Sequence, residues 1–265
     1  MNRLLYSVVI PAVKINGYLD VAVESALDDV GGLGEVIVVI DGPMRPIEAA
    51  WASDDRLTVV ATGRHLGTPR ALNLGLRTAR ADFVVRLDAD DVAVKGRSCQ
   101  LQRQLAMHED CVAVGSWAEL IDDRDVAVGV LEMPESPVQV RAQLIRRNAL
   151  IHSSVMYRRQ AVLAIGGYNE SCPRMQDYEL FLRLAMVGSL CNLPIPLVRY
   201  RMHPDQASRC SSPYRLYTRE VLRARMALAR KSGWSWYAAA LNNALWWVGQ
   251  VARHHGLRQA RYVHS

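Results

Sequence analysis

The sequence has 265 residues, of which 50% are hydrophobic and 22% are charged, and its formal net charge is +6. This length and composition suffice for one substantial core or two joined lobes, and they exclude a wholly disordered chain. The positive charge favours anionic partners, a class that covers nucleotides, phosphates, nucleic acids and acidic lipid surfaces alike.

The N-terminal residues and the cysteines further narrow the class of protein. An apolar run ends at Pro11, which makes it too short for a membrane span, and no small-residue cleavage site follows it. We therefore expect a buried strand there and not a signal peptide. The five cysteines form no CxxC pair, so neither a disulfide framework nor a thiolate zinc site is indicated, and a reducing cytoplasm fits best.

The first third of the chain alternates between two hydrophobic patterns. Continuous aliphatic runs predict strands at 7–11, 35–41, 57–62 and 83–90, and helical spacing of apolar residues predicts helices at 18–28 and 70–79. Strands that alternate with helices indicate βαβ units and a largely parallel sheet. Asp41 and Asp88 each follow one of these aliphatic runs. They are therefore expected at one edge of the sheet, where ligands bind in this architecture.

The pattern loosens after residue 91. The remaining predicted elements are a helix at 96–107, strands at 112–121 and 153–159, a short helix at 161–168 and an amphipathic helix at 178–188. Gly188 is expected to end the last of these helices. Beyond a composition shift at 208–213, the chain is expected to be nearly all helix.

The segment RLDADD at 86–91 is the first candidate for chemistry. Side chains at positions i and i+2 of an extended segment project to the same side, so Asp88 and Asp90 are placed to share one ligand cluster. Neighbouring carboxylates suit Mg²⁺ or Mn²⁺, particularly where a substrate diphosphate completes the coordination. The alternative is a turn whose aspartates cap the following helix. Asp91 is expected to be structural.

Eight segments, in this order, resemble family 2 glycosyltransferases of the GT-A fold, from about residue 5 to residue 208. They are SVVIPAVK, YLDVAVESALDD, VVIDGP, HLGTPRALNLG, LDADD, HSSVMYRRQAVLAIGGY, QDYELFLR and YRMHPDQAS. The resemblance implies an α/β, Rossmann-like nucleotide-binding fold with a mixed, mostly parallel sheet flanked by helices. It also implies a metal-dependent, inverting transfer of a sugar, of hexosyltransferase type, from a nucleotide-diphosphate sugar.

The family resemblance further implies an acceptor and a setting. The acceptor would be a glycan or a polyprenyl-diphosphate-linked saccharide, in the synthesis of a bacterial surface polysaccharide. The enzyme would then be cytoplasmic or peripheral on the inner face of the cell membrane.

The resemblance assigns roles residue by residue. The implied donor-binding residues are Pro11, Ala12, Asp41, Arg70, Asp88 and Ala89. The implied ligands of Mn²⁺ or Mg²⁺ are Asp90 and His203, with Asp88 in support. Taken singly, Asp41 is a turn residue, Arg70 a solvated cation and His203 a loop histidine.

Asp177 is the predicted catalytic base. Inverting transfer needs a carboxylate that removes the acceptor hydroxyl proton as that oxygen attacks the anomeric carbon, and inverting glycosidases use a carboxylate in an analogous way. Asp177 stands near the start of the helix predicted at 178–188, where the helix dipole favours its ionised form. The alternative is that Asp177 only caps this helix.

Four residues depart from the family motifs. They are Val13, Lys14, Pro43 and His65. All four lie around the expected nucleotide pocket, so they leave the nucleobase open while the type of reaction is retained.

The resemblance also divides the chain. Residues 1–210 would form the catalytic domain, with a nucleotide-sugar-binding half at 1–105 and an acceptor and catalytic half at 106–210. Residues 211–265 would form a helical extension.

Residues 232–252 of this extension carry no charge and are predicted to form an amphipathic helix. Its apolar side includes Leu241 and Leu245, and Asn242 and Asn243 lie on the other side. With basic residues before and after it, such a helix suits the surface of an anionic membrane. The alternative is that its apolar side packs on the catalytic domain or on a second subunit.

Three other functions compete with sugar transfer. A catalytically inactive nucleotide-sugar-binding scaffold is compatible with the altered opening motif. A sugar nucleotidyltransferase would need a glycine-rich GxGxR loop, which PAVKINGY lacks. A nucleic-acid binder is suggested by charge alone, without the aromatic and basic strand pattern of single-strand readers, so we expect no nucleic-acid partner.

Overall fold

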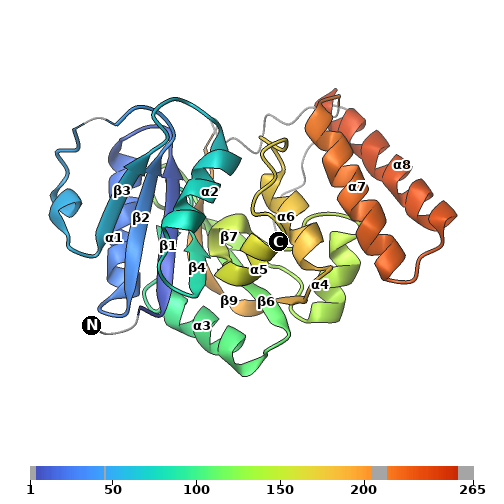
Figure 1. Cartoon of the computed structure of the whole chain (residues 1–265), viewed down its shortest axis with the longest axis horizontal. Coiled ribbons are helices and arrows are strands. Elements are labelled where there is room, and N and C mark those ends of the chain that lie inside the picture. Colours follow the sequence, from blue (N-terminus) through green and yellow to red (C-terminus); the bar gives the residue numbers. More distant parts are fainter. Residues whose placement is uncertain (1–3, 45, 204–213, 256–265) are drawn as a thin grey trace.

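The computed structural model describes residues 4–44, 46–203 and 214–255 of the chain (Figure 1). The strands are β1 Tyr6–Ala12, β2 Gly34–Ile40, β3 Leu57–Ala61, β4 Phe83–Arg86, β5 Val92–Ala93, β6 Cys111–Ile121, β7 Ala127–Leu131, β8 Met156–Arg158 and β9 Ser189–Arg201. The helices are α1 Gly17–Val30, α2 Thr68–Thr78, α3 Arg97–Met107, α4 Pro137–Leu144, α5 Arg159–Ala164, α6 Gln176–Leu184, α7 Leu216–Lys231 and α8 Trp236–His254. Short 3₁₀ turns lie at Ala50–Ser53 and His152–Ser154.

The strands form one nine-stranded mixed sheet in the order β3-β2-β1-β4-β8-β6-β9-β5, and β7 pairs with β6. The first four strands of this order are parallel, as the βαβ pattern predicts. β8 runs antiparallel to both β4 and β6, whereas β9 runs parallel to β6. The carboxyl ends of β1, β2 and β4 therefore meet at one edge of the sheet.

Both faces of the sheet are covered by apolar side chains. Residues of β1 alternate between two cores: Val9 faces the one that contains α2, α4, α6 and α7, and Val8 faces the one that contains α1 and α3. Gly75 lets α2 approach the sheet closely, because a Cβ at this position would collide with the side chain of Val9. This close packing fixes the start of α2 beside the carboxyl edge of the sheet.

The predicted elements of the first third are confirmed, with shifted ends. The expected strand at 83–90 is shorter, because β4 ends at Arg86 and the aspartates that follow lie in a turn. The i, i+2 geometry of an extended strand therefore does not describe Asp88 and Asp90. The expected helix at 178–188 ends at Leu184.

Gly188 serves a purpose other than the predicted end of the helix. A Cβ on Gly188 would lie 2.8 Å from the carbonyl oxygen of Asp110 and would collide with Val112. The glycine therefore lets the start of β9 approach β6 closely.

Three strands and one helix were not predicted: β5, β7, β9 and α4. β9 contains Pro194 and Pro196, which break its hydrophobic alternation and argue against a central strand. The pairing of β6 with β9 shifts register around Trp117, and these irregularities accommodate the prolines.

The C-terminal helices pack together at one side of the molecule, where α8 is the outermost element (Figure 1). The expectation that the apolar side of α8 packs on the catalytic domain is wrong. Asn242 and Asn243 face inward, whereas Leu241 and Leu245 are 62% and 65% exposed. The half-buried asparagines are held by hydrogen bonds, and Ala239 and Trp246 pack on the core beside them.

Three contacts hold the asparagine face of α8. Arg225 on α7 donates from Nε to Asn243 Oδ1 at 2.9 Å. Asn243 Nδ2 donates to the carbonyl of Leu222 at 2.9 Å, and Asn242 Nδ2 donates to the carbonyl of Ile145 at 2.8 Å. Among the described residues, no helix is long and apolar enough to cross a membrane. The predicted boundary at residue 210 and the last ten residues of the predicted extension lie outside the described ranges.

Candidate active site

A cavity of about 680 Å³ opens beyond the carboxyl end of β4. Its wall contains Thr68 at the start of α2, the aspartates Asp88 and Asp90, and Asp177 on α6. The other residues that matter for its chemistry are Arg146, Arg147, Asn148, His152, Arg174, Tyr200, Trp246, Gln250 and Arg253. One cavity thus brings together the two halves of the predicted catalytic domain and α8.

Asp88 lies on the floor of this cavity and is held from two directions. The buried guanidinium of Arg86 forms an ion pair with its carboxylate, and Ser153 Oγ accepts a hydrogen bond from its backbone nitrogen at 2.8 Å. Burial raises the pKa of Asp88, Arg86 opposes that shift, and the charge of Asp90 adds to it. Arg86, a residue without a role in the sequence analysis, is therefore the cation that keeps this carboxylate in place.

Asp91 is buried and structural, as expected. Its Oδ1 accepts a hydrogen bond from the backbone nitrogen of Arg201 at 2.9 Å, which joins the aspartate turn to the end of β9. Burial raises the pKa of Asp91 well above its usual range, and the charges of Asp88 and Asp90 add to this effect.

Asp90 and His203 lie next to each other although they are far apart in sequence. Asp90 Oδ2 is 2.8 Å from His203 Nε2, and their side chains are 32% and 16% exposed. One carboxylate oxygen and one imidazole nitrogen thus lie side by side in the site, in hydrogen-bond contact with each other.

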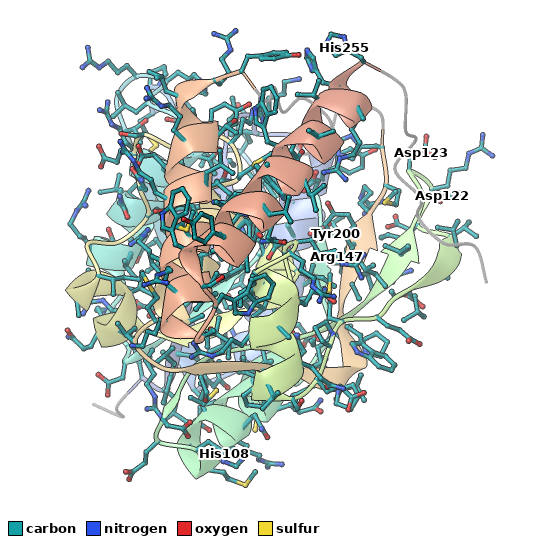
Figure 2. The ribbon with its side chains drawn as sticks, turned by 90° about the vertical axis from the view of Figure 1, so that its right-hand side faces the viewer. His108, Asp122, Asp123, Arg147, Tyr200 and His255 are labelled. Carbon is teal, nitrogen blue, oxygen red and sulfur yellow. The ribbon has the colours of Figure 1, made fainter. Side chains whose placement is uncertain are left out.

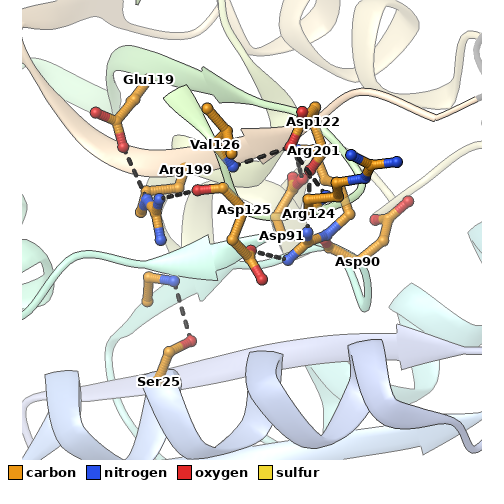
Figure 3. A network of polar contacts seen from close by, with 11 residues as sticks. Ser25, Asp90, Asp91, Glu119, Asp122, Arg124, Asp125, Val126, Arg199 and Arg201 are labelled. Atoms are coloured by element: carbon orange, nitrogen blue, oxygen red, sulfur yellow. Dashed lines mark hydrogen bonds and ion pairs between the residues drawn. The ribbon is translucent and has the colours of Figure 1, made fainter. Parts of the chain in front are cut away.

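Arg201 holds this arrangement together (Figure 3). Its Nε donates to the backbone carbonyl of Asp90 at 2.9 Å, and its other nitrogens bond the carbonyl of Asp122 at 3.2 Å and the carboxylate of Asp125 at 2.7 Å. Its guanidinium also stacks over Tyr18, 4.7 Å from the ring centroid. Sequence reasoning missed Arg201, although it stands two residues before His203 in the YRMH motif.

The donor set at Asp90 and His203 fits a divalent cation that is shared with a substrate. No group of three or more His, Cys, Asp and Glu side chains placed to hold a metal occurs in the described ranges. A cation at this point would therefore take its remaining ligands from the phosphate oxygens of a donor and from water, as Mg²⁺ sites commonly do. Carboxylate oxygen and neutral imidazole are both ligands that Mn²⁺ accepts.

Asp177 lies in the first turn of α6, across the cavity from the aspartate turn. Asn148 Nδ2 donates to its Oδ2 at 2.9 Å. Burial raises the pKa of Asp177, backbone hydrogen bonding at the helix start lowers it, and the charge of Asp88 raises it further. Residue Met175 before the helix has a left-handed backbone, and its side chain provides no cap.

Asp41 follows β2 at the carboxyl edge, as predicted, but its side chain is buried. Its two carboxylate oxygens accept hydrogen bonds from the backbone nitrogens of Leu66 and Gly67 at 2.8 and 2.9 Å, and His65 Nδ1 lies 2.8 Å from Oδ2. The carboxylate therefore fixes the loop that leads into α2. The histidine that departs from the family motif is part of this contact.

The remaining predicted donor-binding residues lie around the same edge. Among the described residues, Pro11, Ala12, Asp41, Arg70 and Ala89 are not in the wall of the cavity. Pro11 and Ala12 end β1, and the carbonyl of Ala12 accepts a hydrogen bond from the nitrogen of Asp41 at 2.7 Å. Ala89 belongs to the aspartate turn.

Arg70 on α2 forms an exposed ion pair with Glu170, at 2.9 Å. Asn73, one turn later, donates to the carbonyl of Tyr168 at 2.9 Å and accepts from its nitrogen at 2.8 Å. These contacts join the NLG and GGY motifs, which lie far apart in sequence, and they fix α2 against the loop before α6.

The part of the cavity near α8 is rich in arginine. Arg146, Arg147, Arg174 and Arg253 all lie in its wall. Figure 2 shows Arg147 and Tyr200 beside α8, which crosses the foreground of that view. His152 in the same wall is kept neutral, because burial and the nearby charge of Arg86 lower its pKa well below the usual range. Of these four arginines, only the adjacent pair Arg146-Arg147 forms a pattern that can be noticed in the sequence.

The family model described as Glycosyl transferase family 2 matches residues 7–166. The chain belongs to glycosyl transferase family 2. This glycosyltransferase is 27% identical over 196 residues to the amylovoran biosynthesis glycosyltransferase AmsE of Erwinia amylovora, which covers 72% of this chain and 73% of AmsE. It is 23% identical over 197 residues to an Escherichia coli UDP-Gal:alpha-D-GlcNAc-diphosphoundecaprenol beta-1,3-galactosyltransferase, over 72% of this chain and 71% of the relative.

Solved structures match the fold of this glycosyltransferase. The Staphylococcus aureus TarS 1–349 structure in complex with UDP-GlcNAc has a TM-score of 0.68 at 15% identity, over 96% of this chain and 73% of that one. In a TarS structure of a longer chain, the match covers 92% of this chain but only 43% of TarS, with a TM-score of 0.62. The helix-flanked mixed sheet of family 2 glycosyltransferases, predicted from the sequence, is confirmed.

Proposed function

We propose that this glycosyltransferase transfers one sugar, with inversion, from a nucleoside diphosphate sugar to a hydroxyl group of a lipid-linked saccharide. The observation that carries the proposal is the single cavity whose wall contains Asp88 and Asp90 on one side and Asp177 on the other. Relatives named for amylovoran and O-antigen biosynthesis support a role in surface polysaccharide synthesis.

The transfer step uses Asp177 as the base. The carboxylate of Asp177 takes the proton of the acceptor hydroxyl while the acceptor oxygen bonds to the anomeric carbon. The bond between that carbon and the diphosphate oxygen breaks, and the nucleoside diphosphate leaves with the electron pair. A raised pKa makes Asp177 a stronger base than an exposed aspartate, which supports this role.

The donor occupies the side of the cavity formed by the aspartate turn. Asp90 and His203 would hold Mn²⁺ or Mg²⁺, with Asp88 in support. Such a cation would supply positive charge to stabilise the departing diphosphate. The other donor-binding residues in this proposal are Pro11, Ala12, Asp41, Arg70 and Ala89, which lie at the same sheet edge.

The acceptor enters from the side of α8. Arg146, Arg147 and Arg253 give this side a positive charge that suits the phosphates of a diphosphate-linked acceptor. The Escherichia coli relative is named for such an acceptor, GlcNAc-diphosphoundecaprenol. In this proposal, residues 1–105 form the nucleotide-sugar-binding half, and residues 106–210 form the acceptor and catalytic half that contains the base.

A donor screen tests the proposal. The full chain is incubated with a panel of nucleoside diphosphate sugars, with Mn²⁺ and with EDTA, and both donor binding and nucleoside diphosphate release are measured. We expect turnover of at least one donor with Mn²⁺ and its loss with EDTA. Binding of a donor without turnover, in the presence of candidate acceptors, would instead support a catalytically inactive nucleotide-sugar-binding scaffold.

The orientation of α8 limits which partner residues 232–252 can bind. Because the asparagine side faces the catalytic domain, the apolar side is left for an external partner, which is a membrane or a second subunit.

A further inference from the structure

Helix α8 is packed with its polar side inward and its apolar side outward. We define the outer face of α8 by its exposed side chains Trp236, Tyr237, Leu241, Leu245 and Val248. Their spacing places them on one side of the helix. A solvated helix normally shows the opposite arrangement, with its apolar stripe toward the core.

The two adjacent C-terminal helices carry a strong excess of basic residues. The exposed basic residues of α7, α8 and the turn before α7 are Arg215, Arg219, Arg223, Arg230, Lys231 and Arg253. Glu220 is the only acidic residue between 214 and 255, and it is paired with Arg223 at 2.7 Å. An apolar helix face with tryptophan and tyrosine, set in a basic surface, is the pattern of helices that lie in an anionic membrane interface.

We infer that the outer face of α8 binds an anionic lipid surface. A second copy of this chain fits the same face less well. A symmetric contact between two outer faces would bring the basic residues of both copies together, where like charges repel. An anionic bilayer attracts the same residues, and each of them raises the binding constant roughly fivefold.

The position of α8 gives this contact a consequence for the cavity. The same helix supplies Trp246, Gly249, Gln250 and Arg253 to the cavity wall, and Leu245 lies at the border between the outer face and the cavity. With the outer face on the lipid, the arginine-rich side of the cavity lies next to the membrane surface. The idea that the membrane presents a lipid-linked acceptor to the cavity rests on the proposed function. The binding of α8 to lipid does not depend on the proposed function.

Vesicle sedimentation tests the inference. The full chain is mixed with phosphatidylglycerol–phosphatidylcholine vesicles and with pure phosphatidylcholine vesicles, at low and at high salt and without any substrate. We expect binding to the anionic vesicles that falls at least tenfold on neutral vesicles and weakens with salt. The double variant Leu241→Glu and Val248→Glu should lose at least tenfold of this binding.

Met107→Glu is the control for added charge away from α8, because Met107 is 70% exposed on α3 and receives one of the two charges that the double variant adds. It should bind vesicles as the wild type does. Circular dichroism and donor turnover in solution should be unchanged in the double variant, which separates a loss of lipid binding from a failure of the proposed function.

Two results would overturn the inference. One is equal binding of the wild type and the double variant to anionic vesicles, or no binding of either. The other is a dimer in analytical ultracentrifugation that the double variant converts to a monomer, without vesicle binding by the wild type, which would make the outer face a contact between two copies of the chain.

Discussion

The environment of Asp177 decides whether this residue can accept a proton near neutral pH. Burial in the cavity wall raises its pKa, and the hydrogen bond from Asn148 lowers it by stabilising the ionised form. The two effects act in opposite directions on the same carboxylate. In the proposed mechanism, Asn148 is therefore a positioning residue for Asp177.

Asn148→Ala tests this role. Loss of the donated hydrogen bond should raise the pKa of Asp177, so that less of the base is ionised at any acidic pH. We expect the acidic limb of the pH profile of kcat/KM to move to higher pH, with a loss of less than tenfold on the plateau. Gln143→Ala is the control, because Gln143 bonds the backbone carbonyl of Asn148 at 3.1 Å and does not contact Asp177. A uniform loss of activity at every pH would argue against tuning.

Helices α2 and α8 show how single residues decide the packing of whole elements. Gly75 on α2 faces Val9 so closely that a side chain has no room there. On α8, hydrogen-bonded asparagines share the inward side with Ala239 and Trp246, so its docking depends on polar as well as apolar contacts.

The orientation of α8 predicts an unusual order of substitution effects. Asn243→Ala removes the hydrogen bond to Nε of the buried Arg225 and the one to the carbonyl of Leu222, so it should lower the free energy of unfolding by about 1–3 kcal/mol. Leu241→Ala, on the outer face, should change this free energy by no more than about 0.5 kcal/mol. Urea denaturation of both variants is the measurement. The reverse order would mean that the apolar side of α8 is the one that packs inward.

The contact between α2 and the sheet gives a second prediction at this scale. Gly75→Ala should lower the free energy of unfolding by about 1–3 kcal/mol, because the added methyl group overpacks the core against Val9. A Cβ at Gly32 meets no atom within 4 Å, so Gly32→Ala should change stability by about 0.5 kcal/mol or less. Equal effects in denaturation experiments would contradict the close approach of α2.

Across the whole molecule, the parallel half of the sheet was predictable and much of the other half was not. Aliphatic runs identified β1 to β4, because strands covered on both faces leave an unmistakable pattern. β9 escaped prediction because its two prolines and its register shifts disguise a long strand. The sequence left open whether the apolar side of α8 faces outward or packs inward, because asparagine normally faces solvent and its partners here are remote in sequence.

The residues of the candidate site, too, were only partly predictable from the sequence. Family motifs indicated Asp88, Asp90, Asp177 and His203, and the structure places the first three in one cavity wall and His203 beside Asp90. The sequence analysis missed Arg86 and Arg201, which hold the aspartate turn through contacts with Asp88 and Asp90. A buried arginine has no sequence signature that separates it from the many arginines on a basic surface, because only the fold reveals its partners.

The central claim is that Asp177 is the base and that the aspartate turn with His203 binds the donor. The most direct test compares donor binding, by calorimetry with Mn²⁺, and the rate of sugar transfer in the wild type and in Asp177→Asn. Asp123→Asn, an exposed substitution in the turn between β6 and β7, is the control and should leave both quantities unchanged. We expect Asp177→Asn to keep the donor Kd within about threefold and to lose about 10²- to 10⁴-fold in transfer. Equal loss of donor binding and transfer, or transfer at the wild-type rate, would contradict the account.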